Sequence, residues 1–200
     1  QERAAAGGEG ATTPQRGFAR QHSGGIKAVA RYDILDTPHD GAFDRVAAIA
    51  ATLFKAPMAT VCIVDTDRVW FKASVGLPGV RQVGRDLGLA ASVILEGKPY
   101  LVTNARSDPR TAEHPLVTGE VGVQFYAAAP IITDDGYSLG TVAVMDTEPR
   151  EATTEQMAIL QDLAAVVMDQ LELRLSAMNA LRDGRTLTDS SVGFPVGHNA

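Results

Sequence analysis

Cysteine is almost absent from this sequence, and so are the long apolar runs of membrane proteins. The chain of 200 residues has one cysteine, Cys62, so no disulfide can form within it and a reducing compartment is expected. No run approaches the roughly 18 consecutive apolar residues that cross a membrane, and residues 1–25 hold no apolar segment of the signal-peptide kind. We therefore expect a cytoplasmic protein that does not insert into membranes.

An excess of basic residues is also lacking. The chain carries 18 Lys and Arg against 24 Asp and Glu, for a formal net charge of -6, and its arginines are interrupted by acidic residues. Direct contact with nucleic acid is therefore not expected. With 45% hydrophobic and 21% charged residues, the composition favours one globular domain with a proper core.

The sequence lacks the residue groupings of most catalytic and metal sites. The four histidines are scattered along the chain: His22, His39, His114 and His198. None belongs to a recognisable arrangement of nucleophile, base and orienting acid. Asp33 with Asp36 and Asp65 with Asp67 have ligand spacing, but both pairs are typical of a loop and a turn. Because a glycine-rich phosphate loop is missing too, we expect no enzyme and no metal site.

Two ends of the chain differ in composition from its middle. Residues 1–25 and 183–200 are rich in glycine and contain few large apolar side chains. Such segments bury too little surface to offset the entropy of ordering, so the sequence predicts a disordered N-terminal arm and a flexible C-terminal tail. The folded domain is expected within residues 26–182.

The middle of the chain alternates between helical and extended patterns. An amphipathic helix is expected over 43–54, capped by Asp36 or Thr37, and a short one over 87–95. Strands are expected at 59–65, 69–75, 100–103, 124–132 and 139–146. The polar connection 104–120 is long enough to fold over something as a lid. This order predicts an α+β fold with an antiparallel sheet and helices on its faces.

The last helix, expected over about 153–182, is longer than a small domain needs. Thr153 and Gln156 have the spacing of a capping box. Its apolar residues recur about every 3.5 positions, the period of a coiled coil. We therefore expect a homodimer whose seam contains Leu171, Leu175, Met178 and Leu181.

Six segments in order resemble the bacterial GAF domains, with the match covering about residues 28–175. They are YDILDTP at 32–38, FDRV at 43–46, VWFK at 69–72, HPLVTGE at 114–120, FYAAAP at 125–130 and LGTVAVMD at 139–146. The resemblance implies a GAF-like antiparallel sheet of five to six strands with long helices near both ends. It also implies a sensory module that binds a small ligand or dimerises, commonly ahead of a histidine kinase, a diguanylate cyclase or another output domain.

Departures from the family pattern narrow that expectation. Ala90, Ala91 and Ser92 stand where related domains often carry cysteine and histidine. No cyclic-nucleotide signature is visible around Asn104, and Cys62 lies on a strand where it is not expected to attach a bilin. A haem signature is not supported either, and the methionine sulfoxide reductases of this fold need several cysteines. The cofactor therefore stays unassigned.

Two hypotheses follow for the function. The first is a non-catalytic sensory domain that binds a small ligand and signals through the last helix to an output domain or partner protein. The alternative is an interaction module whose pocket is filled by its own side chains. Strand alternation and the short helix predict a cavity lined by Phe71, Ala90, Ser92, Phe125 and Tyr126. A register error of one residue would exchange Phe125 for Tyr126.

Overall fold

A sheet of six strands with five α-helices around it forms the part of the chain that the structure describes. This computed structural model describes residues 14–189, with side chains for residues 23–184. The elements run α1 (Pro14–Tyr32), α2 (Gly41–Phe54), β1 (Met58–Val64), β2 (Arg68–Val75), β3 (Gln82–Gly84), a 3-10 turn (Arg85–Leu87), α3 (Ala90–Glu96), β4 (Tyr100–Val102), α4 (Pro115–Thr118), β5 (Phe125–Ile132), β6 (Ser138–Asp146) and α5 (Thr154–Asp189). Strand β3 and helix α4 were not anticipated from the sequence.

The strands pair antiparallel throughout, in the order β3-β2-β1-β6-β5-β4. The predicted turn at 65–68 joins β1 to β2, where Val64 pairs with Val69. The predicted turn at 133–137 joins β5 to β6, and its Gly136 has φ 84°, a value that favours glycine. The predicted α+β fold class with an antiparallel sheet of five to six strands is thus confirmed.

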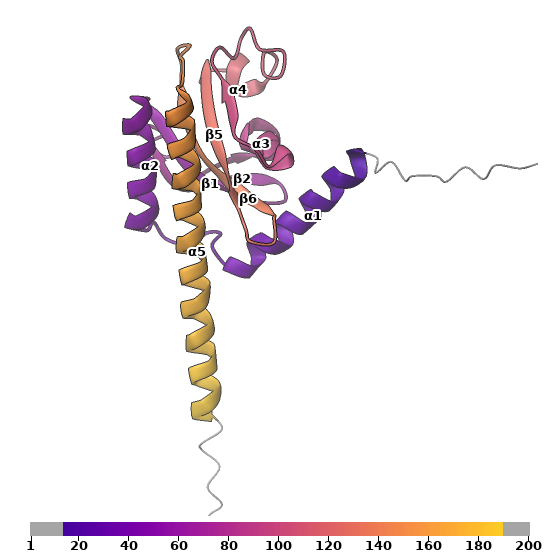
Figure 1. Cartoon of the computed structure of the whole chain (residues 1–200), viewed down its shortest axis with the longest axis vertical. Helices are drawn as coiled ribbons and strands as arrows, with labels where there is room; N and C mark the ends of the chain where they lie inside the picture. The colour runs from indigo at the N-terminus through magenta and orange to yellow at the C-terminus, as the bar shows by residue number, and fades with distance from the viewer. Residues whose placement is uncertain (1–13, 190–200) are drawn as a thin grey trace, which may run out of the picture.

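Successive side chains of each strand point to opposite faces of the sheet, and different helices cover the two faces. Helices α2 and α5 cover one face, and α3 and α4 lie on the other (Figure 1). Phe125, Ala127 and Ala129 of β5 belong to the core under α2 and α5, whereas Tyr126 and Ala128 belong to the other face. Strand β1 lies near the middle of the sheet and is buried along its whole length.

Helix α1 begins at Pro14, inside the range for which a disordered arm was predicted, so that prediction does not hold for residues 14–25. Two glycines explain how the helix packs despite its composition. A Cβ on Gly24 would lie 2.1 Å from the Tyr137 ring, and one on Gly25 would lie 3.1 Å from the Ser138 carbonyl oxygen. The glycines therefore allow α1 to approach the β5–β6 hairpin closely. Residues 1–13 lie outside the described part of the chain.

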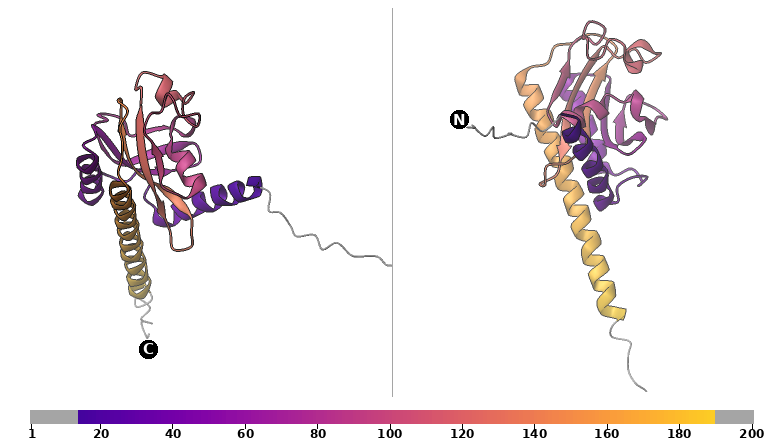
Figure 2. Two further views of the ribbon diagram at one scale, coloured as in Figure 1. Left: turned by 45° about the horizontal axis from the view of Figure 1, so that its top comes forward. Right: turned by 90° about the vertical axis from the view of Figure 1, so that its right-hand side faces the viewer.

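Helix α5 has the predicted capping box and is longer than predicted. Thr153 and Gln156 each accept a hydrogen bond from the other's backbone N–H, at 2.9 and 3.0 Å. The helix has 36 residues, so it measures about 54 Å and extends well beyond the sheet (Figure 2). It continues to Asp189, so residues 183–189 are helical and not a flexible tail; residues 190–200 lie outside the described part. A single Gly184 costs a helix only about 1 kcal/mol.

The predicted dimer seam is corrected at its first residue. Leu171 is fully buried in the core of its own chain, because the end of α1 packs against α5 at this level. The Tyr32 hydroxyl donates a hydrogen bond of 2.6 Å to Glu172 Oε1 there. Leu175 packs partly against the same core, Met178 is half-buried, and Leu181 is 67% exposed.

The start of α2 differs from the prediction as well. The helix begins at Gly41, and its N-cap is Asp40, whose carboxylate accepts a hydrogen bond of 3.0 Å from the Ala42 N–H. Asp36 and Thr37, which were expected to cap this helix, instead contact strand β2. Among residues 14–189, no helix combines the length and apolarity that a membrane crossing requires.

Candidate functional site

An apolar cavity of about 190 Å³ lies on the face of the sheet opposite α2 and α5. Side chains of the sheet form one side of the cavity, which we call the floor. Helices α3 and α4 and two loops form the opposite side, which we call the cover. The lining residues are Met58, Thr60, Cys62, Val69, Phe71, Leu77, Val80, Val83, Gly88, Leu89, Ala90, Leu116, Val121, Val123, Tyr126 and Met145. A volume of this size holds a molecule of roughly one aromatic ring.

The floor follows from the alternation of side chains along the strands. Met58, Thr60 and Cys62 of β1 face the cavity, while Ala59, Val61 and Ile63 between them pack under α2 and α5. Val69 and Phe71 of β2, Tyr126 of β5 and Met145 of β6 complete the floor. Because the large side chains of β1 and β6 at this face are flexible methionines, the floor can adapt to the shape of an occupant.

The cover comes from segments with little regular structure. Leu89 and Ala90 stand at the start of α3, and Leu116 belongs to α4 within the connection predicted as a lid. His114 caps α4 by accepting a hydrogen bond of 3.2 Å from the Leu116 N–H, and burial lowers the pKa of its imidazole. This bond requires the unprotonated Nδ1, which the lowered pKa favours.

Two exposed valines stand at the rim of the cavity. Val80 is 39% exposed and Val121 is 45% exposed, although both line the cavity. The loop that carries Val80 contains Gly76 and Gly79 at φ 73° and 78°, and Gly122 next to Val121 has φ 61°. These left-handed conformations favour glycine, so each rim loop is shaped by glycines adjoining its valine.

The chemistry of the lining is neutral. None of the described residues that line the cavity is charged. The Cys62 thiol lies 3.2 Å from the Thr141 hydroxyl, and burial raises the pKa of Cys62. Burial also raises the pKa of the Tyr126 hydroxyl. Both groups are therefore protonated at neutral pH, and a thiol in this form is a poor nucleophile and a poor metal ligand.

The five residues predicted for the cavity fall into two groups. Phe71, Ala90 and Tyr126 line the cavity together. Ser92 is exposed on α3, and Phe125 is fully buried on the opposite face of the sheet, with its ring centroid 6.1 Å from that of Phe54. Phe125 and Tyr126 are neighbours on a strand, so they point to opposite faces.

Sequence reasoning missed most of the floor of the cavity. The alternate positions Met58, Thr60 and Cys62 carry the signal, because the strand predicted at 59–65 must present every second side chain to each face. Cys62 was predicted to be a packed thiol, and it is buried. No group of three or more His, Cys, Asp or Glu residues within the described chain is placed to hold a metal ion.

A second cluster of side chains connects β2 to the segment between α1 and α2. Arg68 donates two hydrogen bonds to the Asp36 carboxylate, at 2.9 and 2.6 Å, which lowers the pKa of Asp36. Lys72 is buried, and its Nζ donates to Thr37 Oγ1 at 2.9 Å and to the Pro38 carbonyl at 2.6 Å. Residues 33–38, which we call the connector, are thus held by β2.

A β-bulge directs Lys72 toward the connector. Val61 pairs with Ala73 and Cys62 pairs with Phe71, so Lys72 is the extra residue of β2. Its Nζ lies 5.2 Å from the centre of the Phe43 ring, a distance at which cation–π attraction stabilises the charge. Desolvation lowers the pKa of Lys72.

A family model and a longer curated protein match this sequence. The model of the family described as GAF domain matches residues 38–171. Over 144 residues the chain is 37% identical to the cyclic di-GMP phosphodiesterase PA2567 of Pseudomonas aeruginosa, a match that covers 72% of this chain. The chain spans only 24% of the length of that relative.

Solved structures share the fold at low sequence identity. The GAF domain of an Acinetobacter phosphoenolpyruvate-protein phosphotransferase is 16% identical, with a TM-score of 0.56 and coverage of 86% of this chain and 97% of that one. The free methionine-R-sulfoxide reductase of Neisseria meningitidis, solved in complex with its substrate, is 14% identical, with a TM-score of 0.57 and coverage of 86% and 98%. At this identity the likeness concerns the fold alone, and the fold serves both a GAF domain and an enzyme.

Proposed function

This chain belongs to the GAF domain family, and from that premise we propose that it is a non-catalytic sensory domain whose cavity binds a small, uncharged, largely apolar molecule. The observation that carries the proposal is the cavity of about 190 Å³, bounded by apolar side chains and by hydroxyl and thiol groups that stay neutral. An apolar cavity with a few polar groups is the common form of a small-molecule site.

The alternative, an interaction module with a self-filled pocket, is less favoured by the packing. In that alternative, aromatic side chains of the protein would fill the space beside the short helix. Phe125 and Trp70 do not, because they belong to the core on the other face of the sheet. Phe71 and Tyr126 form part of the floor of the cavity and leave its volume open. The small side chain of Ala90 contributes to that space.

Strand β2 offers a route by which occupancy can reach the long helix. Val69 and Phe71 contact the cavity, while Arg68 and Lys72 hold the connector. The connector in turn contacts α5, because Arg174 Nη2 donates a hydrogen bond of 3.3 Å to the carbonyl oxygen of Asp33. A displacement of β2 would therefore move the connector through Arg68 and Lys72, and this movement would change the hydrogen bond between the connector and Arg174 of α5.

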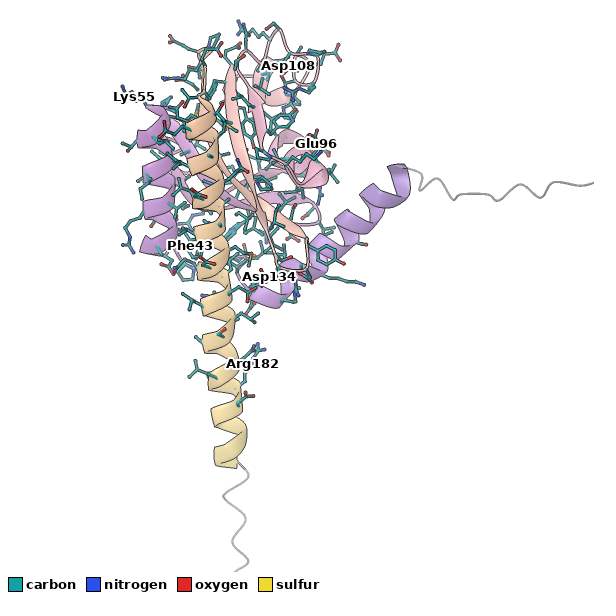
Figure 3. The ribbon with its side chains drawn as sticks, viewed as in Figure 1. Phe43, Lys55, Glu96, Asp108, Asp134 and Arg182 are labelled. Carbon is teal, nitrogen blue, oxygen red and sulfur yellow. The ribbon has the colours of Figure 1, made fainter. Side chains whose placement is uncertain are left out.

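Helix α5 is proposed to carry the output as part of a homodimer. Leu181 is 67% exposed on the part of α5 that extends past the sheet, where Figure 3 labels the neighbouring Arg182. Exposed leucines on a projecting helix are typical of an interface. With Leu171 committed to the core, the proposed seam consists of Leu175, Met178 and Leu181, which lie at i, i+3 and i+6 on one side of the helix.

The methionines provide a direct test of the ligand site. The chain has five, of which Met58 and Met145 line the cavity. The other three lie on α5: Met157, Met168 and Met178. In methyl-13C-methionine NMR, small neutral molecules such as indole and toluene are expected to shift the Met58 and Met145 signals in a saturable way. Native mass spectrometry of the purified protein would identify a natural occupant.

Two substitutions of alanine by leucine, one beside the cavity and one on the surface as its control, show whether the probes bind in the cavity. Ala90→Leu places extra volume in the cavity and is expected to abolish the shifts of Met58 and Met145. Ala48→Leu adds the same volume to the exposed surface of α2 and should leave binding unchanged. If no neutral probe shifts the two cavity methyls, or if Ala90→Leu binds as the wild type does, the cavity is not a ligand site.

A further inference from the structure

A second, polar pocket lies at one end of the sheet and shares no lining residue with the apolar cavity. Its volume is about 410 Å³, and it is lined by Asn104, Arg106, Ser107, Gln124, Thr147 and Pro149. It lies at the end of the sheet near the start of α5, where Figure 3 labels Asp108 of the adjoining loop. We propose that this pocket is a binding site for a small oxyanion, the carboxylate or phosphoryl group of a small molecule.

Three neighbouring strands bring the polar residues together. Asn104 follows β4, Gln124 directly precedes β5, and Thr147 directly follows β6. In an antiparallel sheet with the order β6-β5-β4, the end of β4, the start of β5 and the end of β6 meet at one edge. The pocket is therefore positioned by the most regular part of the fold.

Backbone hydrogen bonds fix this edge. The Ala105 N–H donates to the Gln124 carbonyl at 2.7 Å, and the Gln124 N–H donates to the Asp146 carbonyl at 2.8 Å. The Arg150 N–H donates to the Thr103 carbonyl at 3.0 Å. The segments that carry the lining side chains are thus held before any ligand arrives, which reduces the entropy that binding must overcome.

Gln124 is the residue that indicates a ligand. The residue is 5% exposed, and its side-chain Nε2 is shielded from solvent and has no hydrogen-bond partner among the described residues. Buried polar groups are normally hydrogen-bonded, and a shielded N–H without an acceptor is unfavourable. Because Gln124 lines the pocket, a rotation of its side-chain amide toward a bound oxygen atom would supply the missing acceptor.

The charge of the lining favours an anionic oxygen. Arg106 is the only charged lining residue among those described, and no ion pair of the described structure includes it. The carboxylates of Asp108 and Asp146 nearby are paired with Arg110 and Arg150. Glu148, between Thr147 and Pro149, does not line the pocket. A guanidinium matches carboxylate and phosphate oxygens equally well in geometry.

The test uses the side-chain amide of Gln124 as its reporter. Inorganic phosphate and acetate are titrated into the full chain at constant ionic strength with chloride as the replaced ion, and the side-chain NH₂ signals are followed by 15N NMR. We expect a saturable shift of the Gln124 signal with one or both probes. Response to phosphate alone assigns a phosphoryl group, response to acetate alone assigns a carboxylate, and response to both assigns an oxyanion of either kind.

Matched variants separate a site from general charge effects. Arg106→Gln is expected to weaken binding by about tenfold or more, because a charge-assisted hydrogen bond is lost. Arg45→Gln changes the net charge equally on the exposed surface of α2 and should stay within about twofold of wild type. Binding to Arg106→Gln and Arg45→Gln is followed by isothermal titration or by the amides of neighbouring residues.

Gln124→Met separates a ligand role from a structural one. It removes the unpaired N–H while keeping a side chain of similar length, so we expect weaker binding by about tenfold with stability equal to or above that of the wild type. The proposal is overturned if the Gln124 amide shows no saturable shift up to about 50 mM of either probe. It is also overturned if Arg45→Gln weakens binding as much as Arg106→Gln does, or if Gln124→Met binds as the wild type does.

Discussion

The two faces of the sheet are built from the same strands and differ in what covers them. Under α2 and α5, long helices place side chains from every turn against the sheet, and the core is continuous from Phe43 to Leu171. On the other face the cover consists of short helices and loops, and a cavity lies beneath them. Because open volume lies beneath the second cover, we expect substitutions beside the cavity to cost less stability than substitutions under α2 and α5.

The largest expected effect distinguishes two phenylalanines on opposite faces. Phe125→Ala should lower the free energy of unfolding by about 3–5 kcal/mol, because its ring is fully buried and packs against that of Phe54. Phe71→Ala should cost less than half as much, since Phe71 is half-buried and already borders open volume. Urea denaturation of both variants measures the difference. Equal losses would mean that the two faces contribute alike.

The next prediction uses two alanines. Ala127→Leu adds volume to the packed face and should destabilise the domain by about 1–3 kcal/mol. Ala90→Leu adds the same volume beside the cavity, so its effect on the unfolding free energy should be small or favourable. Thermal and urea unfolding of the pair give the result. A loss for Ala90→Leu as large as that for Ala127→Leu would argue against open space under α3.

The pH dependence of stability should report the thiol in the floor of the cavity. Burial raises the folded-state pKa of Cys62 above its usual value of 9.0. Above pH 9 the unfolded chain therefore loses the thiol proton while the folded chain keeps it. The contribution of Cys62 to stability is complete below pH 9 and falls as pH rises, by up to about 1.4 kcal/mol per pH unit until the folded pKa is reached.

Cys62→Ala isolates this effect from other titrating groups. The difference in unfolding free energy between wild type and Cys62→Ala, measured from pH 7 to pH 10, should be constant up to about pH 9 and then decrease. A difference that stays constant over the whole range would mean that water reaches the thiol in the folded protein.

Much of the fold was predictable because its signals are local. The periodic apolar residues of α2 and α5, the alternating strands and the turns at 65–68 and 133–137 all depend on residues close in sequence. The capping box of Thr153 and Gln156 is of the same kind. The start of α1 was missed because the side chain that makes Gly24 necessary, Tyr137, comes from a hairpin more than a hundred residues away.

The site was harder to predict because its positions depend on tertiary contacts. Alternation alone does not say which face of β5 is hollow, so both Phe125 and Tyr126 were assigned to the cavity. No sequence signal indicates the bulge at Lys72. The position of Asp36 before α2 is typical of a helix cap, and nothing in the sequence shows that its carboxylate accepts from Arg68 instead. Burial of Leu171 likewise depends on the packing of α1 against α5.

The smallest expected effect on stability concerns the rim of the cavity. Val80 and Val121 are 39% and 45% exposed, so replacing both by serine should change the unfolding free energy by no more than about 0.5 kcal/mol each.

Replacing Val80 and Val121 by serine also makes the rim polar, and an apolar probe then loses the contacts that hold it at the rim. We therefore expect weaker indole binding, measured by the Met58 and Met145 methyl shifts, with a melting temperature that changes by no more than about 4 °C. Val166→Ser, an exposed valine of α5 at 44%, is the matched control and should bind as the wild type does. If the double variant binds indole normally, the probe enters elsewhere, and the loops at 76–81 and 119–123 only cover the sheet.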